Sequence, residues 1–164
     1  MQLIEQLRAL GSDMEEQLPY LNHGGCCVYA ANVAKRLQKL GVPVWGIVAD
    51  RDACANLNDA RFNSSPKSVR EWNAEGVEFN HVLIQFVHDG KIWTHDSGTT
   101  TDRKLECDPT LGAPILDGNL TVGELTALAE DTRWNWMFDR DEGIPAITAG
   151  VKQHLSKRAL RGDA

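Results

Sequence analysis

The sequence predicts a single α+β domain in which N-terminal helices pack on an antiparallel sheet. Its 164 residues are 42% hydrophobic and 24% charged, which is enough for one enclosed hydrophobic core. Hydrophobic residues at helical spacing fill the first forty positions, and two β-rich runs follow around an Asp-Gly pair. No repeat, low-complexity tract or linker interrupts the chain, so we expect one domain over residues 1–164.

Charge and cysteine content limit the classes of partner and compartment. The net charge of −6 disfavours a nucleic-acid binder, which needs clustered Lys and Arg to neutralise phosphates. No apolar leader follows the start, and no run reaches membrane-spanning length, so we expect a cytoplasmic protein that binds neither membrane nor nucleic acid. Four cysteines, two of them adjacent, make a poor disulfide framework. The oligomeric state stays open.

Two amphipathic helices are predicted at the N-terminus. The first has apolar residues at helical spacing and ends near Leu18, before Pro19. After a glycine-rich loop, the second begins at Cys26 and is closed by Gly41 and Pro43. Its predicted buried stripe consists of Cys26, Ala30, Val33, Leu37 and Leu40.

A strand over 42–50 and a hairpin are predicted next. Between them lies a long loop, 54–76, with a short helix that Ser65 caps and Pro66 opens. Asp89-Gly90 is a strong hairpin signal, and a two-residue turn places residues whose numbers sum to 179 opposite each other. On this register His81 lies one diagonal step from Asp96 on one face of the hairpin, while His95 faces the other way.

The remaining third is predicted to be a loop followed by two helices. The loop holds Cys107, Pro109 and Pro114. Thr121 and Glu124 form a capping box for a helix that runs to about Asp131. An aromatic turn then leads to a last helix that Pro145 opens and whose end is basic. The aromatic residues of that turn are Trp134, Trp136 and Phe138.

A cysteine nucleophile can be assembled from these elements. The first turn of a helix lowers a thiol pKa through unpaired backbone N–H groups and the helix dipole, and Cys26 and Cys27 both lie in such a turn. A nucleophilic cysteine also needs an imidazole and a third group that orients it. His81 and Asp96, on one face of the predicted hairpin, supply both. Asp96 could instead cap the Ser-Gly turn that follows it.

Three stretches resemble the transglutaminase-like branch of the papain-like thiol enzymes. "GGCCVYA" is similar to the nucleophile motif G-Q-C-W-V-F-A, and the alignment selects Cys26. "NHVLIQF" resembles the family's His-bearing strand and "IWTHDSGTT" its Asp-bearing strand end. The resemblance spans roughly residues 22–100 and implies Cys26 as nucleophile, His81 as base and Asp96 as the orienting acid. Arylamine N-acetyltransferases have a similar order of residues, but this chain is shorter and lacks their Arg before the glycines.

Two departures bear on the substrate site. Cys27 stands where the family has Trp, and Gly25 where it has Gln, so the substrate channel and the oxyanion hole are expected to differ. The Cys26 backbone N–H is one expected oxyanion donor. Asn22 and Trp45 are candidates for the second donor, and with Cys27 they form the predicted substrate-binding set.

The residues therefore predict a cysteine-dependent peptidase or amidase that acts on a peptide or small amide without a cofactor. Acyl transfer of the transglutaminase or arylamine N-acetyltransferase type is one alternative. A non-catalytic binding or inhibitor module on the same fold is another. A zinc site at the cysteines is disfavoured, since the sequence has no C-x-x-C pair and no His pair at helical spacing. Cys26 could also be a buried core residue.

Overall fold

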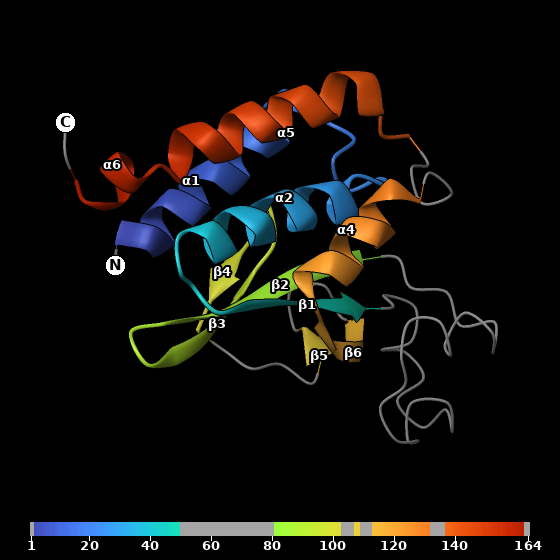
Figure 1. Ribbon diagram of the computed structural model, residues 1–164. Coiled ribbons are helices and arrows are strands. Elements are labelled where there is room, and N and C mark those ends of the chain that lie inside the picture. The colour runs from blue at the N-terminus through green and yellow to red at the C-terminus, as the bar shows by residue number, and fades with distance from the viewer. Residues whose placement is uncertain (1, 50–80, 103–106, 109–112, 132–136, 163–164) are drawn as a thin grey trace.

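The computed structural model describes residues 2–49, 81–102, 107–108, 113–131 and 137–162, and it has an α+β architecture in which the helices cover one face of a sheet (Figure 1). This confirms the α+β part of the predicted fold class. The described helices are α1 (Gln2–Gln17), α2 (Cys26–Lys39), α4 (Val122–Glu130), α5 (Arg140–His154) and α6 (Lys157–Leu160). The described strands are β1 (Val44–Ala49), β2 (His81–His88), β3 (Lys91–His95), β4 (Thr100–Thr101), β5 (Cys107–Asp108) and β6 (Ala113–Leu120).

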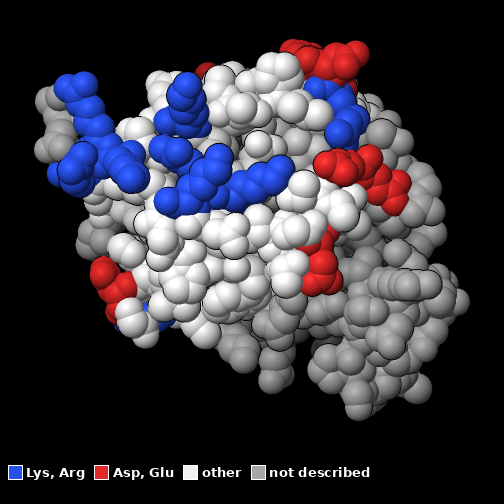
Figure 2. All heavy atoms as spheres, viewed as in Figure 1, with Lys and Arg blue, Asp and Glu red and all other residues white. Residues whose placement is uncertain are grey.

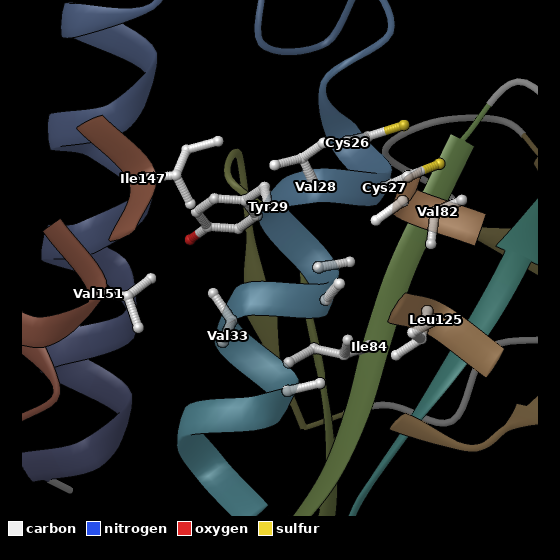
Figure 3. Packing of buried hydrophobic residues seen from close by; sticks show 14 of the residues in the cluster. Cys26, Cys27, Val28, Tyr29, Val33, Val82, Ile84, Leu125, Ile147 and Val151 are labelled. Atoms are coloured by element: carbon white, nitrogen blue, oxygen red, sulfur yellow. The ribbon is translucent and has the colours of Figure 1, made fainter. Parts of the chain in front are cut away.

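Helix α2 is the central helix of the fold. It packs on β1 and β2 and is also covered by α4 and α5, while α1 packs against α5 (Figure 1). The predicted one-sided stripe was therefore too narrow, because Cys27, Val28, Ala31 and Ala34 are buried as well. Several of these side chains are small, so neighbouring elements can approach from more than one side (Figure 3). The N-terminus of α2 is consequently held inside the protein.

The six described strands form one sheet in the order β4-β3-β2-β1-β6-β5, with every neighbouring pair antiparallel. The predicted hairpin register is confirmed: His88 pairs with Lys91 and Ile84 with His95. Asp89 and Gly90 have φ of 51° and 72°, as the preferred two-residue hairpin turn requires. This turn fixes which residues of β2 and β3 share a face.

Two predictions about the last third were wrong. The segment with Pro114 was expected to be a loop, but it forms the start of strand β6. Strand β1 pairs with β2 along one edge, and β6 pairs with the backbone of β1 along the other edge. Helix α5 begins at Arg140 rather than at Pro145, which lies inside it. The reason is the cap: the Asp139 carboxylate accepts hydrogen bonds from two backbone N–H groups of the first turn. This cap starts the helix one and a half turns before the proline.

Other predicted boundaries hold. Helix α1 stops at Gln17, just before Leu18 and Pro19, and the capping box of α4 is present, with Glu124 N donating to Thr121 Oγ1 at 3.1 Å. In the described part of the chain, none of the helices has the length and apolar character needed to cross a membrane. The predicted 54–76 loop and the Trp134 and Trp136 turn lie outside the described residues.

Candidate active site

Cys26 is the first residue of α2, and the two glycines before it are required by the local geometry. Gly24 has a φ of 111°, which disfavours any side chain. A Cβ on Gly25 would lie 2.6 Å from the Phe138 ring and 2.7 Å from the Leu21 carbonyl oxygen. The family's Gln could not be accommodated at this position without moving the neighbours. Among the described residues no side chain caps the start of α2, and the Cys26 backbone N–H is one of the donors that the helix itself does not pair.

His81 and Asp96 are in contact, as the hairpin register predicts. His81 Nε2 donates to Asp96 Oδ2 at 2.8 Å, and both residues are buried. The other carboxylate oxygen of Asp96, Oδ1, accepts from the backbone N–H groups of Gly98 at 2.8 Å and Thr99 at 2.9 Å. Asp96 thus orients the imidazole and caps its turn at once, so the two readings of this residue are compatible.

The second imidazole nitrogen of His81, Nδ1, is buried and has no hydrogen-bond partner among the described residues. His81 and Cys26 shift each other's pKa, so the two side chains interact. Because Nε2 is occupied by Asp96, Nδ1 is the nitrogen that remains available to the thiol. Figure 3 shows the sulfurs of Cys26 and Cys27 pointing toward the start of β2, the strand that His81 begins. The structure therefore shows a direct bond between His81 and Asp96 and an electrostatic interaction between His81 and Cys26.

Electrostatics favour a thiolate and an imidazolium. The Cys27 thiol, as hydrogen-bond donor, lowers the pKa of Cys26 most; His81 and the Val82 backbone N–H lower it further against the effect of burial. Burial alone would lower the pKa of His81, but its bonds to Asp96 and Cys26 raise it to about 9. Burial raises the pKa of Asp96, but His81 and the Gly98 backbone N–H together lower it below its usual value, so the carboxyl stays ionised. The pKa shifts of Cys26, His81 and Asp96 all favour the charged form of the group.

Helix α1 holds the loop after Asp96 in place through hydrogen bonds and one close backbone contact. Ser97 Oγ donates to Glu15 Oε1 at 2.9 Å, and Asn22 Nδ2 donates to the same oxygen at 3.1 Å. Arg8 donates to the Thr100 carbonyl oxygen at 3.1 Å. Gly11 lies so close that a Cβ there would be 2.3 Å from the Ser97 carbonyl oxygen. The position of the Asp96 carboxylate thus depends on contacts from a helix far away in sequence.

A second buried histidine lies on the opposite face of the hairpin, as predicted. His95 Nε2 bonds the Tyr29 hydroxyl at 2.8 Å, and Nδ1 bonds Thr100 Oγ1 at 2.8 Å. Burial lowers the pKa of His95 to about 4. With this pKa the imidazole is neutral at pH 7, and both of its nitrogens are paired with hydroxyl groups. His95 holds α2 to the sheet.

The predicted substrate-binding residues have structural partners. Trp45 donates its indole N–H to Gln85 Oε1 at 3.0 Å, across the β1–β2 pair. Asn22 lies in the α1 cluster described above. Cys27 is buried beside Cys26, and its pKa is raised, first by the hydrogen bond to Cys26 and then by burial. Their role toward a substrate stays a prediction.

No match was found among models of known protein families, curated proteins or solved structures. Within the described residues, no group of three His, Cys, Asp or Glu side chains could hold a metal ion.

Sequence reasoning missed three groups that shape the site. They are the Val82 N–H beside the sulfur, the Cys27 thiol as a donor to Cys26, and Glu15 as a fastener of the Asp96 loop. The adjacency of the cysteines was a signal for the second. Glu15 gave none, because it lies on the polar side of an ordinary amphipathic helix and meets Ser97 only after folding.

Proposed function

We propose that this protein is a cysteine-dependent hydrolase, a peptidase or amidase with a papain-like, transglutaminase-like arrangement of Cys26, His81 and Asp96. The observation that carries the proposal is the chain of contacts at the start of α2. A thiol with a lowered pKa interacts with a buried imidazole, whose Nε2 is held by a carboxylate at 2.8 Å and whose Nδ1 remains available to the thiol. A purely structural histidine needs no such combination of thiol and carboxylate.

The proposed reaction has an acylation half and a deacylation half. The Cys26 thiolate attacks the carbonyl carbon of an amide or ester, and a C–S bond forms. The Cys26 backbone N–H stabilises the oxyanion that develops. As the C–N or C–O bond breaks, the His81 imidazolium gives its proton to the leaving group, which leaves a thioester and a neutral imidazole.

Water then completes the cycle. Neutral His81 takes a proton from the attacking water, the C–S bond breaks, and a carboxylic acid and the Cys26 thiolate are released. His81 keeps the proton, so the ion pair is restored. Asp96 holds the ring in place and stabilises its charged form throughout. An amine in place of water would give acyl transfer by the same steps.

The test uses a small activated ester, because the natural substrate is unknown. With p-nitrophenyl acetate we expect a burst of about one nitrophenolate per chain, and fragment mass spectrometry should place the acetyl group on Cys26. Cys26→Ala and His81→Ala should remove the burst, whereas Cys107→Ala, the matched cysteine control, should keep it. A folded wild-type protein that shows no burst and carries no acetyl group at Cys26 would contradict the proposal and favour the non-catalytic binding module.

A further inference from the structure

A cluster of positive charge lies at the end of the molecule where α2 and α5 finish. Figure 2 shows Lys and Arg gathered over these helix ends and over α6, while most acidic side chains of the same face lie at the other end. We call this cluster the basic belt; it consists of Lys35, Arg36, Lys39, Lys152, Lys157, Arg158 and Arg161. All of them except Arg36 are exposed.

The basic belt is unusual for this chain. It is built from two segments, 33–42 and 148–162, which hold seven Lys and Arg and no Asp or Glu. The other ten Lys and Arg share the rest of the chain with all 23 acidic residues. Basic residues commonly complement the dipole at a helix C-terminus. That role does not account for Lys35, which precedes the last turn of α2. Folding therefore joins two acid-free segments into one surface.

An apolar groove of about 480 Å³ opens beside the basic belt. Its aliphatic lining consists of Leu3, Leu40, Val42 and Leu160, and its polar lining of Gln2, His88, Asp89, Lys157 and Arg161. Two cations of the basic belt thus face one carboxylate in its wall. The groove is concave and lies between the start of α1, the end of α2, the β2–β3 turn and α6. Such a shape receives a side chain from a partner, whereas insertion into a membrane needs apolar residues that protrude.

We propose that the groove and the basic belt together bind an acidic peptide segment of a protein partner. One or two aliphatic side chains of that segment would enter the groove, and its carboxylates would lie along the basic belt. Charge complementarity selects an anionic partner, and the aliphatic lining favours a peptide over a nucleic acid, whose bases stack on aromatic side chains. This proposal does not depend on the proposed function, since neither feature includes Cys26, His81 or Asp96.

The test is fluorescence anisotropy with three fluorescein-labelled peptides and the full chain. The first contains Asp and Glu around a central pair of leucines, the second has serines in place of the leucines, and the third has lysines in place of the acids. We expect saturable binding of the first alone, weakened at least fivefold when NaCl is raised from about 0.05 M to about 0.5 M. Duplex DNA and phosphatidylserine vesicles serve as competing anionic probes.

Variants locate the binding surface. Lys157→Glu combined with Arg161→Glu, and separately Leu160→Ser, should each weaken binding of the first peptide at least fivefold with circular dichroism spectra unchanged. Lys91→Glu, an exposed charge reversal outside the basic belt, should not. Equal binding of the serine peptide, preferential binding of DNA or vesicles, or no peptide binding by the folded protein would overturn the proposal. If the belt variants failed to fold, loss of binding by the folded Leu160→Ser variant would still decide it.

Discussion

Two histidines on one hairpin, His81 and His95, have the same burial and opposite chemistry. Each is 1% exposed, yet the pKa of His81 is raised to about 9 and that of His95 is lowered to about 4. His81 lies between a carboxylate and a thiol, whereas His95 lies between two hydroxyl groups. Burial lowers the pKa of both, so only the partners separate them. A buried histidine becomes a candidate for catalysis through its neighbours.

The five residues from Asp96 to Thr100 link the two histidines. Asp96 orients His81, and Thr100 bonds His95. Three contacts from α1, at Arg8, Gly11 and Glu15, hold this short segment in place. The imidazoles of His81 and His95 are therefore both held by residues 96–100. Substitutions in or against this segment can separate the roles of the two histidines.

The largest effect is expected from Asp96→Asn, which removes the carboxylate that bonds His81. Asn keeps an oxygen for the N–H groups of Gly98 and Thr99, so the turn should survive, but it removes the charge that holds the imidazolium. We expect the rate of Cys26 acetylation by p-nitrophenyl acetate to fall by about 10²–10⁴-fold, with little change in melting temperature. An unchanged acetylation rate would show that Asp96 is only a turn cap.

His95→Asn tests whether His95 is neutral in the fold, through the pH dependence of the free energy of unfolding. In the unfolded chain His95 has a pKa near 6.5, and in the fold about 4, so the unfolded state binds the extra proton between these values. The contribution of His95 is thus fully present above pH 6.5 and is lost as pH falls through 4. Urea unfolding should show the stability difference between wild type and variant shrinking on acidification, by on the order of 3 kcal/mol. A pH-independent difference would contradict a neutral His95.

Gly11→Ala is expected to disturb residues 96–100, which hold both imidazoles. The new methyl group would meet the Ser97 backbone, which cannot rotate away as a side chain can. We expect a loss of about 1–3 kcal/mol in the free energy of unfolding, together with slower Cys26 acetylation. The control is Ser12→Ala, at the next, exposed position of α1, which should change neither by much. Wild-type stability and acetylation in Gly11→Ala would mean that α1 does not position Asp96.

Local signals in the sequence were enough for the hairpin and the triad. A two-residue turn sets the register, and the register decides that His81 meets Asp96 while His95 faces α2. The Thr121 capping box was equally local. Strand β6 was not predicted, because Pro114 indicated a loop, whereas pairing with β1 makes the segment a strand. The start of α5 was not predicted either, because Pro145 indicated a helix start, whereas the Asp139 cap begins the helix earlier. The hydrogen bond between Ser97 and Glu15 could not be predicted, because it depends on tertiary packing alone.

The most direct test of the central claim is the pH dependence of Cys26 alkylation by iodoacetamide, followed by mass spectrometry on the native protein. An ordinary thiol is only about 0.3% ionised at pH 6. We predict that Cys26 is already alkylated at close to its plateau rate there, with a second change near pH 9 as His81 loses its proton. Cys27→Ser should retain both features. A single rise centred near pH 8.5, at the rate of the denatured chain, would contradict an activated thiolate held by His81 and Asp96.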